Sequence, residues 1–364
     1  MKKLFAVLLA LAMVLGMAAC AGGGDDVTNV SVFWYDESDV YLGSVRAALN
    51  AELNKLENVE YDNQFAANNQ TTQLDQITTA IANGADILVV NVVTSGAVDI
   101  AQQVLDKAGD IPVIFFNRAI GADGSEVSFL KDNENVCFIG TDAPEAGHIQ
   151  GKMIGEYLVA NFDTVDLNGD GEISYAMMKG QEGNVEAEYR TQYGVEDANA
   201  VLTEAGKSEL VYFDASNTDK YQVDPDGAWS SKAGKEYMDT NLVSYNEAND
   251  NMIELVICNN DGMAEGVVAA LQEKGYNKEG GHHIPVFGVD ATDNAKALIA
   301  AGAMTGTVKQ DAEGMASAIA GTVNAIIGGS SCTAAPATLK DDRFTTDATN
   351  SNKLYVAYAA YTGE

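Results

Sequence analysis

Short runs of consecutive apolar residues alternate along this chain with longer segments in which apolar residues recur every three or four positions. Runs of the first kind predict strands of a parallel sheet buried on both faces, and the longer spacing predicts amphipathic helices. The alternation therefore predicts a doubly wound α/β fold. The first strands are expected at 29–34, 86–91 and 111–118, and the first helices at 42–56, 69–83 and 97–108.

The same pattern begins again near residue 136 and continues almost to the end of the chain. The 364 residues are enough for two hydrophobic cores, so the sequence predicts two doubly wound parallel-sheet domains. A polar segment at 217–228 is longer than a usual connection. Further strands are expected at 136–140, 173–178, 210–213, 284–289, 305–309 and 354–358, with helices at 143–161, 186–205, 294–301 and 312–327.

One further strand, residues 252–258, is followed by the polar turn 259–262 (Asn-Asn-Asp-Gly) and a predicted helix. Ligands of open α/β sheets bind beyond the carboxyl ends of the strands, which is where this turn lies. Glu254 lies toward the other end of the strand, about 20 Å away at about 3.3 Å per residue. We therefore expect a ligand at one end of this strand and a metal at the other.

The N-terminal residues predict a targeting segment. Two lysines precede an apolar stretch at 4–17 that is too short to span a membrane. Residues 17–20, Met-Ala-Ala-Cys, resemble the bacterial lipobox. We interpret residues 1–19 as a lipoprotein signal peptide, Cys20 as the lipid attachment site, and residues 20–27 as anchor and tether. An ordinary signal peptide with a chance cysteine is the alternative.

Composition and motifs exclude several functions. The formal net charge of −32 repels nucleic acid and anionic membrane surfaces. None of the three histidines adjoins a nucleophile motif, and the sequence contains no GxSxG, Walker A or HExxH pattern. We therefore predict a binding protein and not an enzyme.

Three cysteines follow the targeting segment: Cys137, Cys258 and Cys332. An odd number without a CxxC motif argues against a disulfide framework and against a zinc site. Cys137 and Cys258 stand in apolar runs, so we expect both to be small buried residues.

Residues 166–174 (Asp-Leu-Asn-Gly-Asp-Gly-Glu-Ile-Ser) match the first nine positions of a calcium-binding loop. Oxygen-bearing side chains stand at positions 1, 3 and 5, Gly171 at position 6 permits the turn, and position 7 offers its carbonyl. Position 12 should be a glutamate but is Met177. The site is therefore either incomplete or completed by a distant carboxylate, and a solvated turn is the alternative.

Polar and aromatic residues gather at the expected ends of strands. Carboxylates and amides there suit a polyhydroxyl ligand, because each hydroxyl donates to a carboxylate and accepts from an amide or arginine. The alternative is that Asn and Asp simply favour turns. For Arg190, the alternative is a surface ion pair with Glu186. For Trp229, the alternative is a packed core residue. The strand-end set is Asp39, Tyr41, Asn91, Asn260, Asp290 and Gln310.

Several stretches together resemble one known family, the periplasmic galactose/glucose-binding proteins, which are the sugar receptors of ABC transporters. The likeness extends from Val32 to Tyr358. It implies a type I periplasmic binding protein fold, in which two α/β lobes joined by three crossings close on a sugar. The stretches that carry the resemblance are 113–117, 139–142 with 150–151, 179–180, 259–261 and 285–290.

The resemblance also implies boundaries for the lobes. We expect an N-terminal lobe from residues 28–111 and 311–342, and a C-terminal lobe from residues 112–310 and 343–364. Hinges are expected near Ile111, near Gln310 and before Leu354.

Site residues follow from the same resemblance. The family completes its calcium loop with a glutamate from a distant strand, which matches Glu254 here. Tyr41 stands where the family has Phe, and Asn184, Glu186 and Gln310 also depart from the family pattern. The implied Ca²⁺ ligands are Asp166, Asn168, Asp170, the Glu172 carbonyl, Ser174 and Glu254. The implied sugar-binding residues are Asp39, Tyr41, Asn91, Asn184, Glu186, Arg190, Trp229, Asn260, Asp290 and Gln310.

The leading hypothesis is a membrane-anchored, calcium-stabilised monosaccharide receptor outside the cytoplasm. Its expected partners are a glucose- or galactose-like sugar and an ABC permease, with a chemoreceptor as a further candidate, and we expect a monomer. The alternative ligand is a pentose, a nucleoside or a furanosyl signal molecule. A LacI-type repressor would need a helix-turn-helix and a basic arm, and a hydrolase would need a nucleophile motif.

Overall fold

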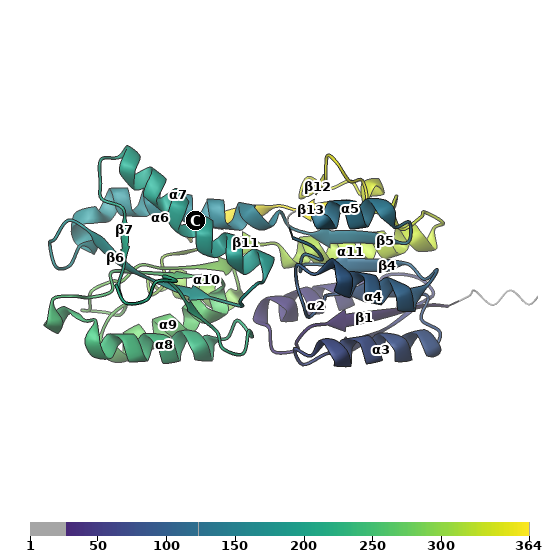
Figure 1. The fold of residues 1–364 in the computed structure, drawn as a ribbon, viewed down its shortest axis with the longest axis horizontal. Coiled ribbons are helices and arrows are strands. Elements are labelled where there is room, and N and C mark those ends of the chain that lie inside the picture. The colour runs from purple at the N-terminus through teal and green to yellow at the C-terminus, as the bar shows by residue number, and fades with distance from the viewer. Residues whose placement is uncertain (1–26, 123, 364) are drawn as a thin grey trace, which may run out of the picture.

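The computed structural model describes residues 27–122 and 124–363, which form two lobes side by side along the long axis of the molecule (Figure 1). The predicted signal peptide, Cys20 and most of the predicted tether lie outside these residues. Within the described part of the chain, no helix combines the length and the apolar character that crossing a membrane requires.

The first lobe contains a seven-stranded sheet with strand order β12-β13-β5-β4-β3-β1-β2. All neighbouring strands are parallel except β12 and β13. Its central strands are apolar and fully buried, as their uninterrupted runs predict. The strands are β1 (Thr28–Trp34), β2 (Val59–Phe65), β3 (Ile87–Val90), β4 (Val113–Phe116), β5 (Val136–Gly140), β12 (Phe344–Thr346) and β13 (Lys353–Val356).

Helices cover both faces of this sheet. Alternate residues of β1 enter different cores: Val30, Val32 and Trp34 pack with one set of helices, and Phe33 with the other. The first set is α2 (Val40–Leu53) and α11 (Ala312–Ile327), and the second is α3 (Gln70–Ala82), α4 (Val98–Ala108) and α5 (Ser125–Asp132).

The second lobe repeats this plan with strand order β14-β11-β10-β9-β6-β7, while β8 pairs with β6. Within the described residues of this second sheet, only the β11–β14 pair is antiparallel. Its strands are β6 (Ile173–Lys179), β7 (Leu210–Tyr212), β8 (Gln222–Val223), β9 (Leu255–Cys258), β10 (Val286–Asp290), β11 (Gly306–Gln310) and β14 (Tyr358–Tyr361). The helices are α6 (Ala143–Val165), α7 (Val185–Glu204), α8 (Ser231–Ser244), α9 (Asp261–Lys274) and α10 (Asp293–Ala300).

Close packing of α6 against α7 positions one wall of the space between the lobes. Gly147, Gly151 and Gly155 face α7, and a Cβ atom on each would lie 2.4–2.6 Å from an atom of that helix. A larger residue at any of these positions would push α7 outward, together with the polar side chains of its first turns.

The chain crosses between the lobes three times, and two crossings differ from the predicted ones. Strand pairing places β4 and β5 in the first sheet, so the first crossing lies at residues 141–142 and not near Ile111. The second lies at Asp311, as expected from the predicted hinge near Gln310. The third lies at Ala357, because β12 and β13 also belong to the first sheet and only β14 joins the second. The predicted lobes were therefore wrong for residues 112–142 and 343–356.

Candidate ligand-binding cleft

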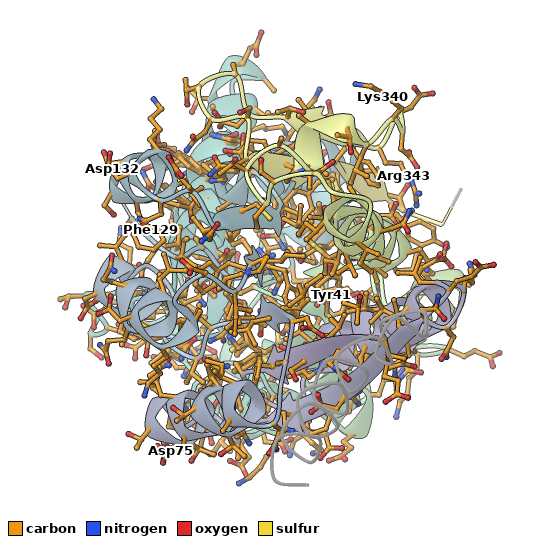
Figure 2. All side chains as sticks on the ribbon, turned by 90° about the vertical axis from the view of Figure 1, so that its right-hand side faces the viewer. Tyr41, Asp75, Phe129, Asp132, Lys340 and Arg343 are labelled. Atoms are coloured by element: carbon orange, nitrogen blue, oxygen red, sulfur yellow. The ribbon has the colours of Figure 1, made fainter. Side chains whose placement is uncertain are left out.

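Side chains from both lobes line a cavity of about 370 Å³ between them, a volume that includes space open to solvent. Nine of the ten predicted sugar-binding residues lie there. Tyr41, on the first lobe, appears near the centre of the molecule in the end-on view of Figure 2. The lining residues are Asp39, Tyr41, Asn117 and Arg118 from the first lobe, and Asn184, Glu186, Arg190, Trp229, Asn260, Asp290 and Gln310 from the second.

Three of the lining residues cap helices whose N-termini point at the cavity. The Asp39 carboxylate accepts from the Leu42 amide at 2.8 Å at the start of α2. Asn184 caps α7 and Asn260 caps α9, each accepting from an amide three residues later at 3.0–3.1 Å. Such caps satisfy amides that the helix leaves unpaired, and they bring the positive end of the helix dipole to the site. The preference of Asn and Asp for turns and their place in the cleft are therefore compatible.

Arg190 is buried at the base of the cleft. Its Nη1 donates to the Asn259 carbonyl at 2.9 Å, and its Nη2 donates to Gln310 Oε1 and Tyr358 Oη at 3.1 Å each. Burial alone would lower the pKa of Arg190, but Tyr358 and the carboxylates of Asp290 and Glu186 raise it overall. Its Nε has no partner among the described residues. Arg190 is thus a fixed cation with one free donor, and its burial excludes the alternative interpretation as a surface ion pair.

Two buried carboxyl groups lie near this arginine. Burial raises the pKa of Asp290 well above its usual value, Asp261 and Asp39 raise it further, and Arg190 opposes the shift. Burial also raises the pKa of Glu186, against hydrogen bonds and the positive charges of Arg190 and Arg118. Groups of this kind are costly to bury without partners, and hydroxyl groups of a ligand would supply such partners.

Two aromatic rings complete the cavity. Trp229 and Tyr41 are buried, with 8 % and 6 % of their surface exposed. Trp229 Nε1 and Tyr41 Oη have no hydrogen-bond partner among the described residues. An unpaired buried donor costs about 1–3 kcal/mol, so both atoms favour a polar ligand or water in the cavity.

Three residues of the cavity lining have unusual backbone angles. Asn117, Trp229 and Asp290 have positive φ angles of 61°, 56° and 126°. Residues other than glycine seldom adopt such angles, and they cluster at functional sites. Their side chains line the space between the lobes, so the unusual angles and the candidate site coincide at these three positions.

The lining of the cavity differs from the predicted set at three positions. Asn91 does not line the cavity, because its Nδ2 donates to the Phe116 carbonyl at 3.0 Å and it is buried at the end of β3. Asn117 and Arg118 follow β4 and line the cavity. Their sequence signal is a pair of polar residues directly after an apolar strand, the same signal that selects the other strand-end residues.

Direct hydrogen bonds hold the two lobes together around the cavity. Glu186 Oε1 accepts from the Ala119 amide at 3.1 Å, and Arg118 Nη2 donates to Gln181 Oε1 at 2.9 Å. At the rim, Asn68 Nδ2 donates to the Asp226 carbonyl at 2.9 Å. The structure therefore has a closed arrangement of the lobes.

A sequence profile described as a periplasmic binding protein domain matches residues 30–331. The chain belongs to this family. This periplasmic binding protein is 33 % identical over 327 residues to the D-galactose/methyl-galactoside binding periplasmic protein MglB of Haemophilus influenzae, covering 89 % of this chain and 88 % of that one. The family predicted from the sequence is confirmed.

Solved structures confirm the fold of this periplasmic binding protein. An ABC transporter solute-binding protein from Bacillus halodurans with bound myo-inositol superimposes with a TM-score of 0.68 at 22 % identity, over 94 % of this chain and 96 % of that chain. A solute-binding protein from Clostridium phytofermentans with bound β-D-glucose superimposes with a TM-score of 0.67 at 22 % identity, over 92 % of this chain and 94 % of that chain. These relatives are solute-binding proteins and not enzymes.

The predicted calcium loop lies at the opposite end of the second sheet from the cleft. Glu254 reaches it from the residue before β9: its Oε1 accepts from the Leu167 amide at 2.7 Å and its Oε2 from the Ser174 amide at 2.9 Å. Asp166 accepts from the amides of Gly169 and Gly171 at 2.7 and 3.0 Å. Burial raises the pKa of Glu254, the loop amides oppose this, and the charge of Asp166 raises it further.

These oxygen atoms fit calcium in kind, because hard cations take carboxylate and carbonyl oxygens. In the structure, the carboxylates of Asp166 and Glu254 accept hydrogen bonds from loop amides. No group of three or more His, Cys, Asp or Glu residues within the described residues is arranged to hold a metal. Ser174 Oγ donates to the Met252 carbonyl at 2.5 Å, so this hydroxyl oxygen is tied to the strand.

Proposed function

We propose that this periplasmic binding protein binds a monosaccharide between its lobes and delivers it to an ABC importer. The observation that carries the proposal is the cavity itself, in which buried carboxyl groups, a buried arginine and two aromatic rings face one space. Carboxylates accept from sugar hydroxyls, Arg190 Nε and Trp229 Nε1 donate to them, and the rings cover the apolar faces of a pyranose. The galactose-binding relative supports the same ligand class.

Closure of the lobes is the proposed mechanism. Ligand contacts come from residues of both lobes, so a bound sugar favours the closed state over an open one. A hinge motion at the three crossings would open the cleft for entry and release. The permease would then recognise the closed, loaded form.

The experiment is a thermal-shift panel with D-galactose, D-glucose, L-arabinose, D-ribose, myo-inositol and uridine. A ligand at 100 times its Kd adds about 2.7 kcal/mol to stability and so raises the melting temperature. We expect the largest rise with a hexopyranose. Asp290→Asn tests the site, and Asp293→Asn, an exposed substitution on α10, is its control. A largest shift with a pentose, a furanose or uridine would establish the alternative ligand class. No shift with any compound would contradict the proposal.

We propose in addition that the calcium loop binds Ca²⁺ through Asp166, Asn168, Asp170, the Glu172 carbonyl and Glu254. The support is the oxygen-only donor set and the contact that Glu254 makes with both ends of the loop. Calcium should raise the melting temperature of the wild type and not that of Glu254→Gln, while sugar affinity changes little because the cleft lies at the other end of the sheet. Equal melting temperatures in calcium and in chelator would refute this proposal.

Membrane attachment through a lipid on Cys20 is the last part of the proposal. It rests on the lipobox-like residues 17–20 and on the extracytoplasmic location of the family. Cys20→Ser should release the protein from the membrane fraction of cells that produce it. A Cys20→Ser protein that stays with the membranes would argue against a lipid anchor.

A further inference from the structure

Two cysteines of the first lobe place their sulfur atoms 3.4 Å apart. Cys137 lies on β5, and Cys332 lies in the turn that follows α11, 195 residues later in the sequence. Both are buried in the core between the sheet and helices α2 and α11. A disulfide bond measures about 2.05 Å, so the sulfurs need to approach by only about 1.4 Å.

The remaining cysteine of the described residues, Cys258, has no part in this pair. It lies on β9 in the second lobe and is buried in a different core cluster. The odd cysteine count therefore resolves into one close pair and one isolated residue. The sequence predicts Cys137 as a small buried residue without a cysteine partner. It does not reveal the pair, because a contact across 195 residues leaves no local motif.

We propose that Cys137 and Cys332 form an intramolecular disulfide bond in the mature protein. The family is extracytoplasmic, and disulfides form and persist in such oxidising environments. The partner sulfur is already in contact, and the turn at Cys332 is part of the first-lobe core.

The oxidant is another disulfide, either that of a thiol oxidoreductase or of a small oxidised thiol. The thiolate of one cysteine attacks this disulfide, which forms a mixed disulfide and releases one reduced thiol. The second cysteine then attacks the protein sulfur of the mixed disulfide and releases the second reduced thiol. The two protein thiols lose two electrons and two protons, and the oxidant disulfide gains both and becomes two thiols.

The reaction takes place while the first lobe folds. In the folded protein both thiols are buried, and burial together with the contact to Cys332 raises the pKa of Cys137 well above its usual value. A protonated, inaccessible thiol reacts poorly with disulfides. The same burial protects the finished bond from reductants.

The bond would join the two separate passages of the chain through the first lobe. Cys137 lies four residues before the first crossing, and the closed loop contains all of the second lobe except β14. Cross-links over long loops remove much of the freedom of the unfolded chain, with a typical gain of about 2–4 kcal/mol. For a protein of this size we expect a rise in melting temperature of about 5–10 °C.

The test is peptide mapping of the full chain, produced with its signal peptide and purified without reductant. Free thiols are alkylated under denaturing conditions before digestion and mass spectrometry. We expect a linked pair of peptides that contain Cys137 and Cys332, lighter than the sum of the two by two hydrogen atoms, and an alkylated Cys258. Alkylation of both Cys137 and Cys332 would overturn the proposal.

Melting temperatures with and without dithiothreitol provide the second test. The protein is denatured, reduced with dithiothreitol and refolded before the measurement, because the bond is buried in the folded state. This treatment should lower the melting temperature of the wild type by about 5–10 °C. Cys258→Ala should keep this difference and Cys332→Ala should lose it. An equal difference in both variants would assign the effect to another cause and refute the disulfide.

Discussion

Gly180 leaves room for the ring of Trp229, and filling that room should impair ligand binding. A Cβ atom at residue 180 would lie 2.1 Å from Cε3 and 2.2 Å from Cδ2 of the indole. Ordinary carbon–carbon contacts are about 3.5–4.0 Å, so in Gly180→Ala the ring must move by about 1.5 Å. Backbone at both residues restricts this movement, because the Gly180 amide donates to Asn259 Oδ1 at 3.0 Å and Trp229 has a positive φ.

The expected cost in affinity follows from what Trp229 offers a ligand. If one ring face contributes about 50 Å² of apolar contact, its loss costs about 1.2 kcal/mol at about 25 cal/mol per Å². A lost hydrogen bond from Nε1 adds about 1 kcal/mol. The sum of about 2 kcal/mol corresponds to a Kd about 30-fold higher.

Fluorescence titration with the monosaccharide that gives the largest thermal shift measures this effect. Trp34 is fully buried in the first lobe, where its Nε1 donates to Asn63 at 2.7 Å, so changes on binding report on Trp229. Gly43→Ala on α2 is the matched control, because no atom lies within 4 Å of its Cβ position. Calorimetry replaces fluorescence for variants without Trp229, and adding Gly180→Ala to Trp229→Ala should weaken binding no further. A Gly180→Ala protein with unchanged Kd and melting temperature would refute the argument.

Two further predictions concern positions outside the set of ligand contacts. Asn68→Gly keeps a positive φ but loses the hydrogen bond to the Asp226 carbonyl across the cleft. Sugar affinity should therefore fall by about 2- to 10-fold. An unchanged Kd by calorimetry would exclude a role of Asn68 in closure. Burial raises the pKa of Asp261 to about 7, so its charging opposes folding as pH rises from about 4 to 7. The melting temperature of Asp261→Asn should therefore fall less over this range than that of the wild type, and parallel curves would contradict the assignment.

The sequence predicts the elements of this fold well but not their distribution between lobes. Strands β4 and β5 have the same buried, apolar character as strands of the second sheet, so their pattern carries no information about which sheet they join. The crossing at residues 141–142 lies in an ordinary strand-to-helix turn. Only the pairing of β4 with β3 and of β5 with β13 decides it.

Residue type and position after a strand predict most of the cavity lining. The same two criteria also select Asn91, which lies outside it. Asn91 and Asn117 both follow apolar strands at the cleft side of the first sheet. Asn117 has a φ of 61° and lines the cavity, while Asn91 bonds to backbone atoms of neighbouring strands. Residue type reveals neither the backbone angle of Asn117 nor the hydrogen bonds that hold Asn91.

Arg190 connects the cavity to the crossings between the lobes. Its partner Gln310 ends β11 directly before the second crossing, and its partner Tyr358 begins β14 directly after the third. Tyr358 Oη also lies 2.9 Å from Oγ1 of Thr141 at the first crossing. The remaining donor, Nε, is free to bind a ligand. A ligand that holds Arg190 in place therefore favours the closed arrangement to the extent that these hydrogen bonds differ between open and closed states. This gives the buried arginine a role that a surface ion pair would lack, because one side chain contacts the ligand space and the hinge together.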